Sequence, residues 1–308
     1  MSVKYLLAAL APLFLSSCVA AQTPAPQPDP DPFATWTEAC EDWGEWDKPG
    51  PPFRVHGNTY YVGTCGIAVL LVANGDQLVL LDTGTAESSA SVIANIRALG
   101  FRPSRIEAIL VSHEHFDHVG GLASMQAEGF VQYVVTGHPA VEVLTTGFSS
   151  EDDPQHGIHQ PMASAQRVQG TAGEGPVTVT EVPSGTSISF NPIVTPGHTP
   201  GALTWQWESC NDEGECLTIV YADSLSAISS DDYRFSDHPD YVEAFRDGLA
   251  RLMELDCDIL LTPHPSSSGM RDKLLAGDLT SGMNCAEYAE LMDTRLSRRL
   301  AEEAGAAQ

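Results

Sequence analysis

The 308-residue sequence predicts an α/β fold in which two β-sheets pack together and helices cover their outer faces. Short apolar runs with the spacing of strands occur in two groups, one in each half of the chain. Each group is followed by segments with helical spacing. Apolar residues make up 43% of the chain, which is enough for the buried core of one large domain.

The first group comprises three expected strands, at residues 59–64, 66–74 and 77–84. Gly75 and Asp76 supply the turn between the last two runs, which favours a sheet built from hairpins. Residues 86–99 carry apolar side chains at helical spacing, and Gly100 is a normal helix stop. A buried strand is expected next, at residues 106–112.

The second group comprises four expected strands, at residues 177–182, 187–198, 203–208 and 216–224. Helical spacing follows at residues 241–255 and 286–303, and a further strand is expected at residues 257–261. The chain shows no internal repeat with a clear period and no second linker. We therefore expect a single domain at residues 33–308.

The N-terminal part has the layout of an export signal. In residues 1–21 a lysine precedes an apolar run at residues 5–15, and small residues follow. Residues 22–32 are rich in proline and lack apolar periodicity, so they are expected to form an extended tether. The mature protein is therefore expected in the periplasm.

Within this signal, "LSSC" at residues 15–18 resembles a bacterial lipobox, whose cysteine is acylated after cleavage. Cys18 would then anchor the protein to a membrane. Ordinary cleavage near residues 20–21 is the alternative.

Cysteine parity agrees with export. Seven cysteines are present, and six remain if Cys18 carries lipid or is removed with the signal. Cys210 and Cys216 flank the polar turn "NDEGE", and we expect them to pair. The most economical scheme for the others is Cys40 with Cys65 and Cys257 with Cys285. Spacing alone does not settle this connectivity. A structural zinc site of thiolates is the rival, but no C-x-x-C spacing occurs.

The balance of 15 Lys and Arg against 41 Asp and Glu gives a formal net charge of −26. Such a chain repels phosphate backbones, which excludes nucleic acid as a partner. The charge is interpreted as a solvated acidic surface that maintains solubility. The protein is expected to act as a monomer.

The segment "VSHEHFDHVGG" predicts a metal centre. In an extended chain, residues two apart point to the same side, so His113 and His115 can reach one ion. Asp117 and His118 follow where the chain begins to turn, and they can face a second ion. Imidazole together with carboxylate suits zinc, while ligand type alone leaves iron and manganese open.

Two other parts of this segment have different roles. Glu114 is not placed as the base of an H-E-x-x-H helix, because the second histidine follows two residues later, not four. It is expected to point away from the metals. Gly120 and Gly121 allow the next element to begin at close range without a Cβ clash.

Two further ligand candidates stand just after expected strands, as His113 does. His198 lies in "TPGHTPG" and His264 in "LLTPHPSSSG". The remaining histidines are interpreted as surface or core residues, namely His56, His138, His156, His159 and His238.

Together, H-x-H-x-D-H, T-P-G-H-T-P-G, Y-A-D-S-L-S-A and T-P-H-P resemble, in that order, the metallo-β-lactamase superfamily. More narrowly, they are similar to the third subclass of class B β-lactamases. The resemblance runs from about Trp36 to the C-terminal helix. It implies a four-layer αββα sandwich with two mixed sheets and two zinc ions in a groove at the sheet edges.

The resemblance also implies roles for single residues. It assigns one zinc to His113, His115 and His198 and the other to Asp117, His118 and His264. Asp117 would in addition orient the zinc-bound hydroxide. Ser224 and Ser226 would contact the substrate carboxylate, and Asp82 would support the histidine loop through hydrogen bonds.

The implied activity is hydrolysis of the amide bond of penicillins, cephalosporins or carbapenems by a zinc-bound hydroxide. Residues 145–160, with Phe148, are either a lid over the groove or a plain surface loop.

The alternative activity is hydrolysis of lactones or thioesters, which the scaffold would favour if Asp223 bridged both metals. If Asp223 points away and Ser224 faces the groove, the lactamase interpretation stands. A protein that merely binds zinc is a third interpretation, against which six intact ligands argue.

Overall fold

The computed structural model describes residues 31–180 and 186–306. The expected signal and Cys18 lie outside the described residues, as does the tether up to residue 30. Helix α1 (Pro32–Ala39) begins the described part, with the Asp31 side chain accepting a 3.0 Å hydrogen bond from the Phe33 amide. Within the described ranges, no helix has the length and apolar character needed to cross a membrane.

The first sheet has seven strands that are adjacent in chain order. They are β1 (Phe53–His56), β2 (Thr59–Tyr61), β3 (Leu70–Asn74), β4 (Gln77–Leu81), β5 (Ile106–Leu110), β6 (Tyr133–Gly137) and β7 (Val168–Thr171). The pairs from β1 to β4 are antiparallel, and those from β4 to β7 are parallel.

The second sheet has five strands in the order β12-β11-β10-β9-β8. They are β8 (Val177–Thr180), β9 (Ser187–Val194), β10 (Leu203–Cys210), β11 (Cys216–Tyr221) and β12 (Ile259–Leu261). Only the pair of β11 and β12 is parallel. Because β9 and β11 both run antiparallel to β10, the chain leaves β9, β11 and β12 at the same edge.

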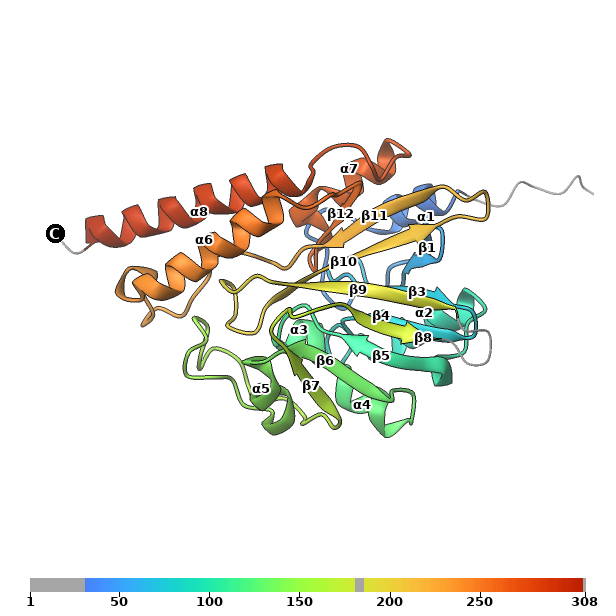
Figure 1. Cartoon of the computed structure of the whole chain (residues 1–308), viewed down its shortest axis with the longest axis horizontal. Coiled ribbons are helices and arrows are strands. Elements are labelled where there is room, and N and C mark those ends of the chain that lie inside the picture. Colours follow the sequence, from blue (N-terminus) through green and yellow to red (C-terminus); the bar gives the residue numbers. More distant parts are fainter. Residues whose placement is uncertain (1–30, 181–185, 307–308) are drawn as a thin grey trace, which may run out of the picture. The chain divides into compact units, whose positions relative to one another are not determined.

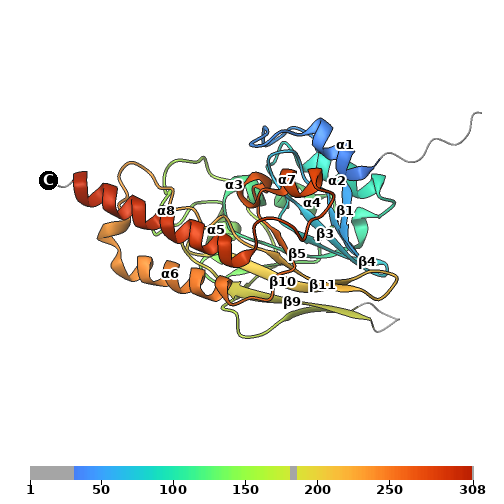
Figure 2. The ribbon, with the colours of Figure 1, turned by 90° about the horizontal axis from the view of Figure 1, so that it is seen from above.

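Helices form the outer layers (Figures 1 and 2). The first sheet is covered by α2 (Ser89–Ala98), α4 (Leu122–Ala127) and α5 (Ala140–Thr146). The second is covered by α6 (Pro239–Met253) and α8 (Cys285–Ala306). The short helix α7 (Met270–Leu275) packs against α1 and helps to close the core between the sheets. The four layers confirm the expected αββα class.

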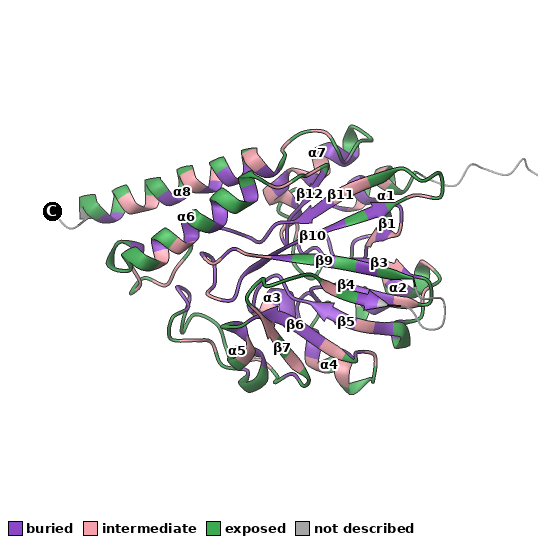
Figure 3. Cartoon of the chain, in the orientation of Figure 1, coloured by how far each residue is buried: buried purple, intermediate pink, exposed green. Residues whose placement is uncertain are grey.

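Strand alternation explains the layers. In β3, Leu70 and Val72 face the core between the two sheets, where they join Trp205 of β10. Leu71, between them, faces the helices and joins Ile93 of α2. Both faces of the strand are therefore buried, as Figure 3 shows for the central strands. This accounts for the continuous apolar runs in the sequence.

Some boundaries differ from the expectations. The strand expected at residues 66–74 begins only at Leu70, because the preceding chain turns back on itself. The Thr64 amide donates to the Ile67 carbonyl (2.9 Å), and the Thr64 hydroxyl donates to the Trp46 carbonyl (2.6 Å). The strand expected at residues 187–198 ends at Val194, which leaves the following loop free to carry His198.

All three expected disulfides are present. Their Cα atoms lie 5.1 Å apart in Cys40–Cys65, 4.0 Å in Cys210–Cys216 and 6.1 Å in Cys257–Cys285. The last bridge connects the chain before β12 to the start of α8.

Candidate metal centre

Strand ends from both sheets supply the candidate ligands. His113 and His115 follow β5, and Asp117 and His118 lie in the short helix α3 (Phe116–Val119). From the second sheet, His198 follows β9 and His264 follows β12. These strands all end at one edge of the sandwich, so side chains distant in sequence meet there.

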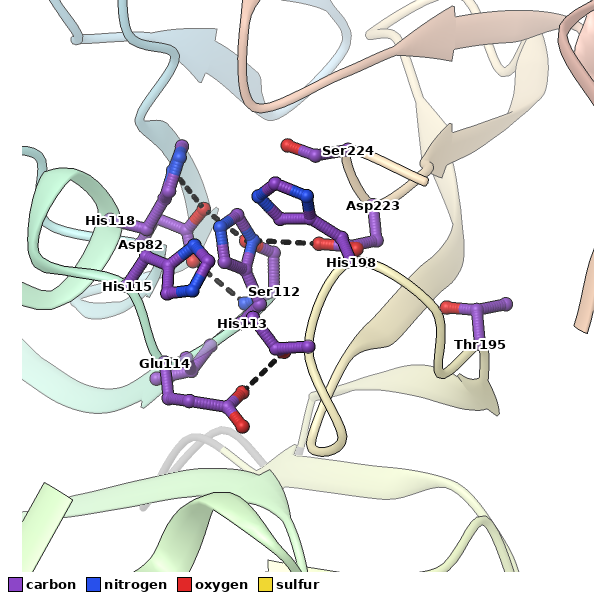
Figure 4. A network of polar contacts seen from close by, with 12 residues as sticks. Asp82, Ser112, His113, Glu114, His115, His118, Thr195, His198, Asp223 and Ser224 are labelled. Atoms are coloured by element: carbon purple, nitrogen blue, oxygen red, sulfur yellow. Dashed lines mark hydrogen bonds and ion pairs between the residues drawn. The ribbon is translucent and has the colours of Figure 1, made fainter. Parts of the chain in front are cut away.

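The first cluster contains His113, His115 and His198, whose ligand atoms all lie within 4.8 Å of one another. All three are buried. Figure 4 shows their rings converging. His113 and His115 thus reach one position, as their spacing predicts.

The second cluster centres on Asp117. Its Oδ2 atom lies 3.0 Å from Nε2 of His118 and 3.4 Å from Nε2 of His264. His113 also lies within 4.8 Å of the Asp117 and His118 ligand atoms. The structure therefore brings together all six residues that the sequence singles out.

Nε2 of His113 is buried and makes no hydrogen bond. The two nitrogens of His118 are buried as well and lie 3.0 Å from Asp117 and 3.4 Å from Asp82 without hydrogen-bond geometry. A buried polar atom without a partner costs about 1–3 kcal/mol. A metal ion would satisfy such atoms, so the residues present fit a metal centre of mixed imidazole and carboxylate donors.

The pKa values of two histidines of the first cluster and of Asp117 suit metal ligands. Burial lowers the pKa of His113 and of His198 well below the usual value, and nearby histidines lower both further. Both rings are therefore neutral, as metal binding requires. Burial alone would raise the pKa of Asp117, but neighbouring histidines, above all His118, hold it well below its usual value.

Asp82 makes hydrogen bonds to the start of the histidine loop, the contacts that the family resemblance implies for it. Its carboxylate accepts hydrogen bonds from the amide and the hydroxyl of Ser112, both 2.7 Å, and from the Tyr221 hydroxyl at 2.8 Å. Oδ2 also lies 3.4 Å from Nδ1 of His118. Asp82 has a φ of 60°, a strained conformation that these contacts maintain.

Asp223 is directed at a histidine. Its Oδ1 lies 2.8 Å from Nδ1 of His113, and the side chain is fully buried. This contact leaves Nε2 of His113 for a metal. Among the described residues, Asp223 belongs to neither cluster of converging ligand atoms.

Glu114 points away from the histidine rings, as expected (Figure 4). It accepts hydrogen bonds from the Thr199 hydroxyl (2.6 Å) and the Gly201 amide (3.0 Å). Glu114 therefore joins the histidine loop to the "TPGHTPG" loop that carries His198. Gly120 and Gly121 behave as predicted too, since a Cβ on Gly120 would lie 2.4 Å from the Phe116 carbonyl oxygen.

Residues 145–160, here called the lid segment, contact the centre in ways that the sequence did not indicate. Oδ2 of Asp153 lies 3.1 Å from Nε2 of His115, and the side-chain Nε2 of Gln155 lies 3.4 Å from Nε2 of His198. The ring of His159, interpreted above as a surface or core residue, lies tilted against that of Phe116 with centroids 4.7 Å apart. Such aspartates and amides look like ordinary loop residues in the sequence.

A cavity of about 360 Å³ adjoins both clusters. Trp46, Phe116 and Ile228 supply apolar walls, and the polar lining includes Ser224 and Arg295. The Ser224 hydroxyl is buried without a hydrogen-bond partner. Ser226 also lines the cavity, but its hydroxyl lies 3.0 Å from Nδ1 of His198 and so helps to orient that ring.

Arg295 could not be identified from its local sequence. It lies in α8, two helical turns after Tyr288, whose hydroxyl donates to the Ser224 carbonyl at 2.8 Å. The same face of the helix therefore holds the loop that carries Ser224 and Ser226, here called the serine loop, and brings a cation to the cavity.

Comparisons with known proteins agree with this geometry. A family model described as the metallo-beta-lactamase superfamily matches residues 62–211. The chain is similar to the MIM-2 metallo-beta-lactamase, with 44% identity, a TM-score of 0.78, and coverage of 88% of this chain and 98% of that one. It is also similar to MIM-1 from Novosphingobium pentaromativorans, with 41% identity, a TM-score of 0.81, and coverage of 89% and 100%.

Among curated proteins, the chain resembles "7,8-dihydropterin-6-methyl-4-(beta-D-ribofuranosyl)-aminobenzene-5'-phosphate synthase" of Methanocaldococcus jannaschii. The two are 31% identical over 115 residues, which are 37% of this chain and 35% of that protein. The chain thus spans only about a third of that relative's length.

Proposed function

We propose that this chain, which belongs to the metallo-β-lactamase superfamily and within it to subclass B3, hydrolyses the amide bond of β-lactams. The observation that carries the proposal is the convergence of six candidate ligands beside a cavity lined by Ser224 and Arg295. The chain's likeness to MIM-2 and MIM-1 over nearly their whole lengths supports the same activity.

The proposal includes two zinc ions. His113, His115 and His198 would hold the first, and Asp117, His118 and His264 the second. When bound, two zinc ions supply an activated water nucleophile at neutral pH and polarise the lactam carbonyl.

Hydrogen bonds on the outer ring nitrogens select the atoms that face the first ion. Asp223 occupies Nδ1 of His113, and the Ser226 carbonyl lies 3.1 Å from Nδ1 of His198. Both rings therefore offer Nε2. Asp117, held ionised by the histidines, would orient the attacking water by accepting a hydrogen bond at a carboxylate oxygen.

The cavity fits a substrate that carries a carboxylate. The unpartnered Ser224 hydroxyl can donate to one carboxylate oxygen, and the Arg295 guanidinium supplies a positive charge in an otherwise acidic protein. Ser226 contributes less directly than the sequence implied, because its hydroxyl contacts His198. Trp46 and Ile228 provide apolar contact for the remainder of the substrate.

The position of Asp223 favours β-lactams over lactones and thioesters. Asp223 interacts with the outer nitrogen of His113, which disfavours a role as a bridge between two metals. Ser224 instead lines the cavity.

Export to the periplasm is part of the proposal. Three disulfides support folding in an oxidising compartment. Acylation of Cys18 would anchor the protein, and the intact mass of the membrane fraction tests it. Light scattering of the soluble domain tests whether it is a monomer.

The deciding experiment measures turnover of a penicillin, a cephalosporin and a carbapenem by the purified soluble domain. Activity should disappear on chelation and return with zinc. A zinc-loaded protein that hydrolyses none of the three but cleaves lactones or thioesters would contradict the proposal.

A further inference from the structure

We propose that Asp153 is a positioning residue for His115, through which the lid segment and the first metal position stabilise each other. This inference rests on metal binding at His115, one part of the proposed function, and is independent of the substrate.

Asp153 is buried within an exposed stretch of the lid segment. Its side chain is 3% exposed, whereas Glu151 and Asp152 are exposed. One carboxylate oxygen lies 3.1 Å from Nε2 of His115, and the other accepts a 2.7 Å hydrogen bond from the backbone amide of Gln155. Burying a carboxylate is costly unless such partners compensate, so this position is strongly specified.

The contact decides which nitrogen of His115 is free. With Nε2 donating to Asp153, only Nδ1 can bind a metal. The other two rings of the cluster are oriented from the second sheet, by Asp223 and by Ser226. His115 is the ring whose outer nitrogen is held by a carboxylate of the lid segment.

The same short stretch makes two more contacts, one of them with a candidate ligand. The Pro154 carbonyl accepts a 2.8 Å hydrogen bond from the Ser230 amide, and Gln155 lies beside His198. On either side, Phe148 is 64% exposed and Ile158 is 48% exposed. Asp153 and Gln155 therefore connect the lid segment directly to two candidate ligands, His115 and His198.

Coupling between two such sites is reciprocal. If Asp153 fixes the orientation of the His115 ring that a metal requires, a bound metal in turn fixes the orientation that Asp153 requires. Metal binding should therefore order the lid segment, and loss of Asp153 should weaken metal binding. A carboxylate that only stabilised a surface loop would leave metal affinity unchanged.

Zinc affinity of the full soluble domain tests the first half of the coupling. Competition with a chromophoric chelator should show that one of two ions binds about 10- to 100-fold more weakly in Asp153→Ala. Asp153→Asn keeps a hydrogen-bond acceptor at this position, so its zinc affinity should fall less than that of Asp153→Ala. Asp152→Asn, a matched change at the exposed neighbour, should bind both ions like the wild type. His115→Ala identifies the ion that occupies the first position.

Hydrogen exchange of residues 147–160 tests the second half. Zinc should increase amide protection in the wild type and have little effect in Asp153→Ala. Unchanged zinc affinity in Asp153→Ala, an equal loss in Asp152→Asn, or the same zinc-dependent protection in both proteins would overturn the inference. A wild type that binds no zinc would overturn it too. Neither measurement uses a β-lactam, so failure of the proposed substrate class alone is recognised separately.

Discussion

Replacing Thr199 by valine should loosen the junction between the histidine loop and the loop that carries His198. Thr199 is fully buried, and valine has nearly its shape, so the main loss is the 2.6 Å hydrogen bond to Glu114. A hydrogen bond to a charged group contributes about 1.5–3 kcal/mol. The Gly201 amide remains as a second donor to Glu114, so we expect the free energy of unfolding to fall by the lower half of that range.

The size of this loss should depend on pH. Burial raises the pKa of Glu114, while the hydrogen bond from Thr199 lowers it. Without the hydroxyl the pKa rises further, and protonation then relieves the unpaired charge. The destabilisation should therefore be larger at pH 8 than at pH 5.

Urea unfolding of the metal-free protein measures the effect, with Thr178→Val as control. Thr178 is exposed on β8, and its hydroxyl lies 2.8 Å from that of Ser189. The control should stay within about 0.5 kcal/mol of the wild type. A Thr199→Val protein as stable as this control, at both pH values, would refute the proposed role of Glu114 as a connection between the two loops.

Three further predictions concern other parts of the protein. Burial lowers the pKa of Lys273 to about 8 from 10.5. The stability contributed by burying the neutral amine is therefore complete above pH 10.5 and is lost as pH falls through 8. The stability difference between wild type and Lys273→Met should therefore grow by about 1–2 kcal/mol from pH 7.5 to 9.5 in urea unfolding, and a constant difference would contradict this. Replacing both Cys257 and Cys285 by serine opens a loop with a sequence separation of 28, which should cost about 3–4 kcal/mol in the same assay. Arg295→Ala should raise KM for a carboxylate-bearing penicillin about 2- to 5-fold with little change in kcat, as for a solvent-exposed ion pair, whereas Arg298→Ala should match the wild type.

Local spacing made much of the centre predictable. The offset of His113 and His115 acts over two residues of backbone, so extended geometry alone brings these two side chains to one side. His198 and His264 could be proposed because each follows an apolar run that reads as a strand. What these residues share is a signal contained within about ten neighbours.

Residues that reach the centre through tertiary structure carry no such signal. Asp153 sits among other acidic residues, and only its fold position distinguishes it from Asp152. Arg295 approaches the cavity because α8 packs on the serine loop, which its helical pattern does not reveal.

The strands show the same difference between features with a local sequence signal and features that only the tertiary structure determines. The long apolar runs of β3 and β4 were predictable, because both of their faces are buried. Strands β6 and β7 are short and pair with neighbours distant in sequence, and the sequence around them gives no clear periodicity. Their pairing depends on packing against the neighbouring strands of the sheet more than on their own residues.

The candidate ligands follow strands of both sheets, so neither sheet alone supplies the full set. Long loops must close before the last of them joins the first, which is a slow class of folding event. Metal capture would consequently come late in folding, after the sandwich has assembled. An ion bound only to the finished protein shifts the equilibrium towards it by mass action. The metal supply would then govern how long the folded enzyme survives, as well as how fast it works.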